Sequence, residues 1–261
     1  MPEALTNKTL PISVFIIAKN EADRIATTIN SVKDWVAEVI VIDSGSTDDT
    51  VSVASFLGAR VVYNEWAGYG LQKRFGEDEC ANDWLLNLDA DEEISPELAA
   101  EIKALFEGGE PEMAAFIMKV RDLLPNETHL APLAHTNHCL RLYNRNKGRF
   151  SESPVHDSVI MESEYTSQVS QLTSPVFHRS FRNIAHAIEK MNSYSTAQAE
   201  NLRKRGKKLA FAHLRLVFEF PISFFKAYIL RLYIMRGWRG FVYASIYAFG
   251  RMVRIAKYLE F

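Results

Sequence analysis

The chain has 261 residues, 48% of them hydrophobic, and a formal net charge of −2. This length and composition suit one large α/β domain, or one domain with an appendage, and exclude a disordered chain. The two cysteines, Cys80 and Cys139, are too few for a disulfide framework and too far apart for a CxxC metal site, so we expect both to be reduced. The N-terminal stretch has no basic segment followed by an apolar one, and we expect no secretory signal.

Charge is distributed unevenly along the chain. Residues 182–261 hold 15 Lys and Arg against 4 Asp and Glu, a net charge of +11, whereas residues 1–181 have a net charge of −13. An acidic body followed by a basic region indicates two surfaces with different partners. We therefore divide the chain into a first domain at 1–181 and a C-terminal region at 182–261.

Continuous apolar runs in the first half predict strands that are buried on both faces. They are rich in β-branched and aromatic residues and lie at 12–18, 37–43, 59–64 and 83–89. Two later runs, at 114–120 and 139–144, predict further strands of the same domain. Helical patterns separate the early runs, and this alternation predicts an α/β fold with a mainly parallel sheet flanked by helices.

Two helix starts can be read from capping residues. Ser46 followed by Asp49 has the spacing of a capping box, which would open a helix over about 47–57. Ser95 followed by Pro96 predicts an N-cap and a first-turn proline, for a helix that ends near Gly108.

Polar clusters follow three of the predicted strands. They read "AKNE" after the first strand, "DSGSTDD" after the second and "DADEE" after the fourth. Open sheets bind ligands beyond the carboxyl ends of their strands, so three such clusters at corresponding ends predict a binding site. A solvated, Asp-rich turn is the alternative for each cluster taken separately.

The C-terminal region is helical, basic and aromatic from about residue 183. Its longest charge-free stretch near the end, 240–250, is far shorter than the ~20 apolar residues that span a bilayer. Arginines alternate with Phe, Tyr and Trp, as in helices that lie on an anionic membrane surface. Docking of these aromatic residues onto the first domain explains the same pattern, and both interpretations stay open.

Four motifs in order, "IIAKNEADRI", "VIDSGSTDDT", "GYGLQKRF" and "WLLNLDADEEIS", make the chain resemble a family 2 glycosyltransferase. The later "RLYNRNKGRF…VHD" block is similar to bacterial enzymes that add glucose in β-1,4 linkage to the inner-core heptose of lipopolysaccharide. The resemblance covers about residues 12–180 and is diffuse beyond. It implies a GT-A fold, a nucleotide-sugar donor, a divalent metal and inversion at the anomeric carbon.

The resemblance assigns the donor side of the site. Asp91, the last acid of the DxD motif, would contact the metal, and Asp89 would lie nearer the ribose and on the metal side. An all-oxygen set fits Mg²⁺ or Mn²⁺ equally. Asp43 would bond the uracil or ribose, although an acid here can also cap its own turn. Glu21 would line the nucleotide pocket, although first-turn placement in a helix explains it equally well.

The basic residues of "GYGLQKRF" are candidates for donor contacts. Lys73 and Arg74 follow two glycines that permit close backbone approach, and Arg74 could face the diphosphate. A solvated helix face is the alternative for both.

An inverting transfer needs a base for the acceptor hydroxyl. "PVHD" offers Asp157 as that base and His156 as its helper. Related enzymes usually carry His-Glu here, so Asp157 shortens the reach by one methylene, and Asp89, Glu92 and Glu93 are competing acids.

Two arginines are candidates for the acceptor side. Arg141 and Arg145 could meet acceptor phosphates, because guanidinium forks suit phosphate oxygens.

The expected partners are UDP-glucose, a lipopolysaccharide core acceptor and an anionic membrane surface, with no nucleic acid. The expected location is cytoplasmic, peripheral on the inner face of the inner membrane. A polyprenyl-phosphate sugar synthase or another surface-polysaccharide glycosyltransferase is the nearest alternative, and a non-catalytic nucleotide-sugar binder is the alternative of a different class. The choice among glucose, galactose and N-acetylglucosamine stays open at this point.

Overall fold

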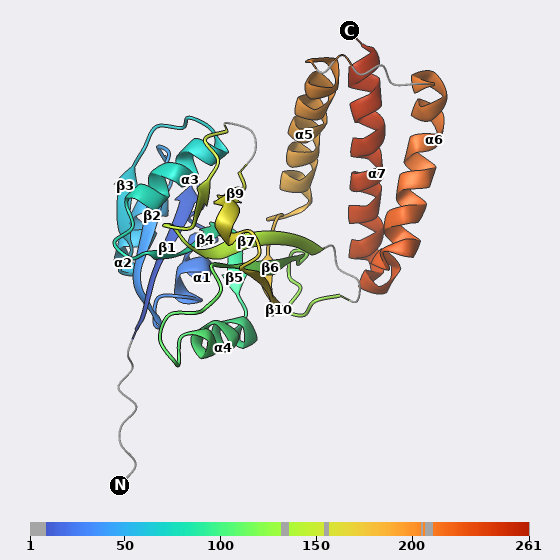
Figure 1. The fold of residues 1–261 in the computed structure, drawn as a ribbon. Coiled ribbons are helices and arrows are strands. Elements are labelled where there is room, and N and C mark those ends of the chain that lie inside the picture. Colours follow the sequence, from blue (N-terminus) through green and yellow to red (C-terminus); the bar gives the residue numbers. More distant parts are fainter. Residues whose placement is uncertain (1–8, 132–135, 154–156, 205, 207–210, 261) are drawn as a thin grey trace. The chain divides into compact units, whose positions relative to one another are not determined.

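The computed structural model describes residues 9–131, 136–153, 157–204, 206 and 211–260 (Figure 1). The chain divides into two compact units. The first comprises residues Met1–Arg121 and Thr136–His178, and the second comprises Asp122–His135 and Arg179–Phe261.

Within the described residues, the first unit is built on an eight-stranded sheet of order β3-β2-β1-β4-β7-β6-β10-β5. Its strands are β1 (Leu10–Ala18), β2 (Val36–Asp43), β3 (Arg60–Tyr63), β4 (Trp84–Asp89), β5 (Glu92–Ile94), β6 (Ala115–Asp122), β7 (Thr136–Asn144) and β10 (Val169–His178). A hairpin of β8 (Gly148–Phe150) and β9 (Val159–Met161) stands apart from it.

The sheet is parallel in its first half and antiparallel in its second. β1 pairs in parallel with β2 and β4, and β2 pairs in parallel with β3. β7 runs antiparallel to β4 and β6, and β10 runs antiparallel to β5. The predicted α/β fold of a sheet flanked by helices is confirmed, and all six apolar runs form strands. The strands β5 and β10 were not predicted.

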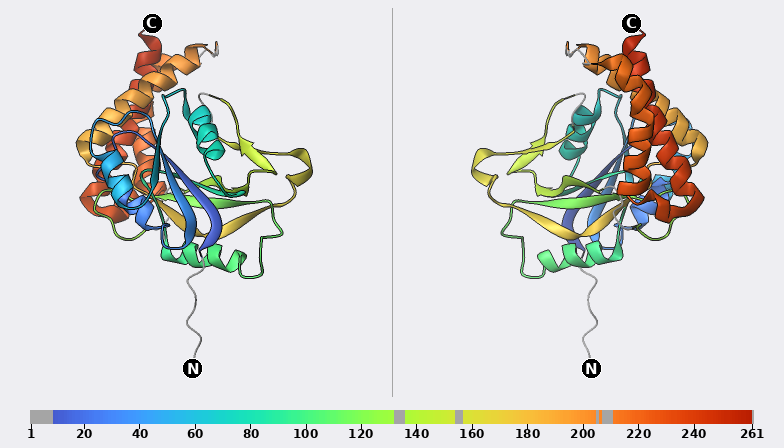
Figure 2. Two further views of the ribbon diagram at one scale, coloured as in Figure 1. Left: turned by 90° about the vertical axis from the view of Figure 1, so that its left-hand side faces the viewer. Right: turned by 90° about the vertical axis from the view of Figure 1, so that its right-hand side faces the viewer.

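Alternation along β1 sends side chains to both faces of the sheet. Ile12, Val14 and Ile16 lie in one core with residues of α1 (Ile25–Asn30), α2 (Thr50–Phe56) and α4 (Pro96–Leu105). Phe15 lies in the other core, against α3 (Tyr69–Asp78) and the β8–β9 hairpin. Figure 2 shows α3 and α4 on opposite sides of the sheet.

One of the two capping predictions is confirmed. The Ser95 hydroxyl accepts a hydrogen bond from the Leu98 amide at 3.2 Å, at the start of α4. The predicted capping box at the start of α2 is wrong, because the helix begins at Thr50 and the Ser46 hydroxyl donates to Asp43 instead.

The second unit is a layer of long helices, α5 (Ile184–Lys204), α6 (Ala212–Phe225) and α7 (Gly237–Leu259). A π-helical turn, η2 (Lys226–Leu230), and a short 3-10 turn, η3 (Tyr233–Arg236), join α6 to α7. α7 packs against both α5 and α6 and lies between them (Figure 1). Among the described helices, none combines the length and apolarity that a bilayer crossing requires.

Candidate active site

The predicted polar clusters meet at one edge of the sheet because the register aligns the strand ends. Ala18 of β1 is opposite Asp43 of β2, and Ile17 is opposite Asp89 of β4. Asp43 and Asp89 therefore end the two strands that flank β1, at the same edge of the sheet.

The loops after β1 and β2 are tied together by side chains bonded to backbone amides. The Asn20 amide donates to the Ser46 hydroxyl at 2.9 Å, and the Glu21 amide donates to the Thr50 hydroxyl at 2.7 Å. The Ala22 amide donates to Asp48 at 3.2 Å. Many polar groups of "DSGSTDDT" thus hold the loop in place.

Asp43 is buried and caps its own turn. Its Oδ2 accepts from the amides of Gly45 at 2.9 Å and Ser46 at 3.0 Å, which is the alternative considered for this residue. Gly45 has φ +85°, a conformation that favours glycine. A contact between Asp43 and a nucleotide stays a prediction.

Asp89 is held by two cations. Its Oδ1 lies 3.0 Å from the Lys73 ammonium, and its Oδ2 lies 2.9 Å from the Arg141 guanidinium. Burial opposes ionisation of Asp89, but Arg141 and Lys73 outweigh it and hold the pKa of this carboxyl well below its usual range. Asp89 is therefore a carboxylate at neutral pH.

Arg141 lies inside the unit, where it joins β7 to the acidic motif. Its guanidinium donates to Glu92 at 2.8 Å as well as to Asp89 and Asn87. Burial raises the pKa of Glu92, and Arg141 offsets this in part. The prediction that Arg141 meets acceptor phosphates is not supported, because the guanidinium is buried and already bonded to these side chains.

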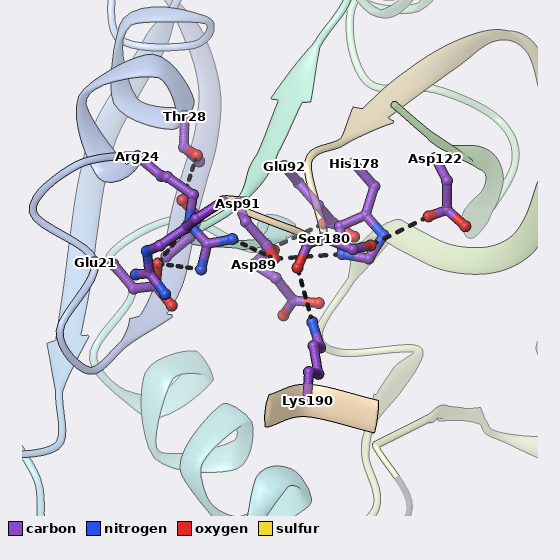
Figure 3. Close-up of polar contacts among 12 residues, drawn as sticks. Glu21, Arg24, Thr28, Asp89, Asp91, Glu92, Asp122, His178, Ser180 and Lys190 are labelled. Carbon is purple, nitrogen blue, oxygen red and sulfur yellow. Dashed lines mark hydrogen bonds and ion pairs between the residues drawn. The ribbon is translucent and has the colours of Figure 1, made fainter. Parts of the chain in front are cut away.

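Asp91 is approached by two residues that sequence reasoning missed (Figure 3). Its Oδ2 lies 3.3 Å from Arg24 and 3.5 Å from the His178 imidazole. Burial opposes ionisation of Asp91, yet the hydrogen bond and charge of His178, and the charge of Arg24, keep the pKa below its ordinary value. Arg24 also donates to Glu21 at 2.8 Å, which brings Glu21 to the same cluster.

The missed residues carry no local signal. Arg24 precedes α1 within a helical pattern. His178 ends β10, far along the chain, and reaches the motif because β10 pairs with β5, with His178 opposite Glu92.

The Asp91–His178 pair fits a divalent cation that accepts both oxygen and nitrogen ligands. It offers a carboxylate oxygen and an imidazole nitrogen in one place, a set that suits Mn²⁺ better than Mg²⁺, which prefers oxygen ligands. Within the part of the chain described, no group of three or more His, Cys, Asp or Glu forms a complete metal site. Such ions commonly complete their coordination with water and substrate phosphates.

Lys73 connects the motif to the predicted base. Its side chain has no exposed surface, and its ammonium lies 2.7 Å from Asp157 as well as 3.0 Å from Asp89. The Asp157 side chain is 41% exposed and therefore accessible to an incoming group. His156 lies outside the described residues.

Arg74 and Arg145 are engaged elsewhere. Arg74 donates to the Phe150 carbonyl at 3.0 Å. Arg145 donates to the Cys80 carbonyl at 2.8 Å and lies 3.4 Å from Asp83, which precedes the amino end of β4. Asp89 ends that strand, so Arg145 and Asp89 lie at opposite ends of β4, and a contact of Arg145 with acceptor phosphates stays a prediction.

Comparisons with known proteins identify the family of the chain. The model of the family described as "Glycosyl transferase family 2" matches residues 13–161. An uncharacterized glycosyltransferase of Rickettsia felis is 44% identical over 255 residues, which cover 95% of this chain and 89% of the relative. The lipopolysaccharide core biosynthesis glycosyltransferase LpsC of Rhizobium meliloti is 33% identical over 256 residues, which cover 92% of this chain and 90% of LpsC.

Two solved structures are also similar. S. aureus TarS aligns with a TM-score of 0.46 and 15% identity, over 95% of this chain and 89% of that one. Glucosyl-3-phosphoglycerate synthase from Mycobacterium tuberculosis, crystallised with Mn²⁺, UDP and glucosyl-3-phosphoglycerate, has a TM-score of 0.46 and 20% identity over 76% of this chain and 81% of that one. Because the family model spans more than half of the sequence, the chain belongs to glycosyl transferase family 2.

Proposed function

We propose that the chain is an inverting hexosyltransferase that moves glucose from UDP-glucose to an inner-core heptose of lipopolysaccharide. The observation that carries the proposal is the Lys73 ammonium, which holds the Asp89 carboxylate of the DxD motif and the Asp157 carboxylate together. The similarity to LpsC along almost the whole chain supports the acceptor class.

The donor would lie beyond the ends of β1, β2 and β4. Asp43 and Glu21 would contact the nucleoside, while Asp91, His178 and Asp89 would lie on the diphosphate side. A divalent ion held by Asp91 and His178 would neutralise charge on the departing diphosphate. Arg24 lies 3.3 Å from Asp91 and would shift toward Glu21, to which it is already bonded.

Asp157 would act as the base. Its carboxylate takes the proton of the acceptor hydroxyl while that oxygen bonds to the anomeric carbon and the carbon–diphosphate bond breaks. Attack from the face opposite the leaving group inverts the configuration. Lys73 would hold Asp157 in position, and His156 would assist it.

The acceptor is a lipid in this proposal, so we place the reaction at the cytoplasmic face of the inner membrane. The proposal includes no nucleic-acid partner.

A donor panel against truncated lipopolysaccharide cores tests the proposal. UDP-glucose, UDP-galactose and UDP-N-acetylglucosamine are each incubated with Mg²⁺ or Mn²⁺ and cores that end at the inner heptose. We expect glucose transfer, with a β-1,4 linkage in the isolated product.

The other outcomes are equally informative. Transfer to a polyprenyl phosphate but not to the core would replace the proposal with the sugar synthase. UDP binding without transfer, and without slow UDP-glucose hydrolysis, would indicate a non-catalytic binder.

A further inference from the structure

The outer face of α6 is apolar and exposed. Leu214, Phe218, Ile222 and Phe225 recur at intervals of three or four residues, and each side chain is more than half exposed. The row continues to Ile229 in η2, which is 37% exposed. We call these five residues the α6 apolar face.

The opposite side of α6 is already packed. Ala212, Ser223 and Ala227 are buried, and the Phe224 ring meets Phe241 of α7 with centroids 5.4 Å apart. α6 therefore carries apolar residues on two sides, and the second unit covers just one of them, although the helix also holds Arg215 and Glu219. A contiguous exposed apolar row of this kind marks a contact surface, so the outer face calls for a partner.

The charge of this region selects the partner. Residues 201–259 contain 13 Lys and Arg and a single acid, Glu219. That carboxylate is neutralised, since it lies 3.5 Å from Arg215 and 2.9 Å from Arg251. Lys226, directly after α6, is exposed. The apolar face thus belongs to a basic stretch of the sequence, and between 211 and 259 the described chain has no unpaired acid.

We propose that the α6 apolar face inserts into the headgroup layer of an anionic lipid bilayer, so that α6 lies on the membrane without crossing it. Apolar side chains flanked by Lys and Arg are what such helices present to anionic lipids. Trp238 at the start of α7 is 65% exposed, with the Arg239 guanidinium 5.6 Å from its ring, and tryptophan favours this interfacial layer.

A second copy of the chain suits this surface less well. Two such faces in contact would bring basic residues against basic residues, which is unfavourable. The membrane proposal rests on the proposed function in one respect: the proposed acceptor is a membrane lipid, which the enzyme would reach by binding to the bilayer.

Vesicle sedimentation of the full chain tests the proposal. We expect strong partitioning onto phosphatidylglycerol-containing vesicles, at least tenfold weaker partitioning onto phosphatidylcholine, and a further weakening in high salt. Phe218→Glu combined with Ile222→Glu should lower binding to the anionic vesicles at least tenfold, because two apolar groups would no longer leave water.

A matched control separates this face from exposed apolar residues in general. Phe56, on α2 of the first unit, is 89% exposed, and Phe56→Glu should leave vesicle binding unchanged. Circular dichroism of each variant, compared with the wild type, checks that the fold is retained.

Three results would overturn the proposal. They are equal vesicle binding by the double variant and the wild type, equal binding to both kinds of vesicle, and a wild-type chain that binds no vesicle but forms a dimer in light scattering, where the double variant is monomeric.

Transfer to a soluble, delipidated core separates this proposal from the proposed function. The double variant should keep that activity and lose transfer to vesicle-embedded acceptor; if neither variant nor wild type transfers sugar, the proposed function fails while sedimentation still reports docking.

Discussion

Lys73 has a charged side chain with no exposed surface, and two carboxylates compensate its charge. A buried charge is tolerated when it is paired in this way. The pairing makes the ammonium a fixed link between Asp89, at the end of β4, and Asp157, after the β8 strand. The position of the proposed base therefore depends on a residue of α3.

Asp157→Asn should lower kcat by about 10²–10⁴-fold, because general-base catalysis contributes about that much. Donor affinity should change little, since Asp157 acts on the acceptor. The measurement is the transfer rate together with UDP titration by calorimetry. A rate loss below threefold would assign the base elsewhere.

Asp91→Asn should abolish the dependence of donor binding on Mn²⁺ or Mg²⁺, because a neutral amide is a poor ligand for these ions. Calorimetric titration of UDP with and without metal measures this. Asp83→Asn is the matched control, because Asp83 precedes the opposite end of β4 and pairs with Arg145. Unchanged metal dependence in Asp91→Asn would move the metal to other ligands.

Part of the site follows from strand order. Asp43 and Asp89 could be grouped from the sequence because parallel strands end at one edge of a sheet. Arg24 and His178 could not, because their contacts with Asp91 depend on a helix start and on the pairing of β10 with β5. The position of Arg145 could not be predicted for a related reason, since a chemical preference for phosphate carries no information about which strand end the residue occupies.

At the level of elements, α4 has a well-defined start. The Ser95 hydroxyl accepts from the Leu98 amide, and Ser95→Ala should remove this cap at a cost of about 1 kcal/mol. Urea unfolding measures the change. Ser52→Ala serves as the control, because the exposed Ser52 hydroxyl donates to the Asp49 carbonyl, just before α2, and caps no helix start. Equal stability of Ser95→Ala and the wild type would contradict the assigned role.

Strands were predictable where burial is uniform. β1 and β2 are covered on both faces, so nearly every residue is apolar and the run stands out. β10, with the sequence VSQLTSPVFH, mixes polar residues with a proline and has an irregular burial pattern. β5 consists of acidic motif residues whose strand form depends on β10. Such strands are set by their neighbours rather than by their own composition.

At the level of the whole molecule, acid should destabilise the fold. The pKa of both Asp89 and Asp91 lies below the ordinary value of about 3.9, so their contribution to stability is present above that pH and is lost as the pH falls through the folded-state values. The raised pKa of Glu92 acts in the opposite sense and offsets part of the loss.

Thermal unfolding between pH 7 and pH 2.5 measures this effect. We expect the unfolding temperature to decrease as the pH drops below about 4. The decrease should be less steep in Asp91→Asn, which has one carboxylate fewer to protonate. The slope of the unfolding temperature against pH is the quantity to compare, since the substitution also changes the unfolding temperature at neutral pH. Parallel curves for variant and wild type would contradict a depressed pKa at Asp91.

The ties between the loops after β1 and β2 bear on how enzyme kinetics should be interpreted. Asp48 and Thr50 hold the backbone of Ala22 and Glu21, and so set the alignment of one loop through the other. Weakened donor affinity after substitution of Asp48 or Thr50 would therefore report a misaligned loop. A raised Michaelis constant in such a variant would not identify the substituted residue as a ligand contact.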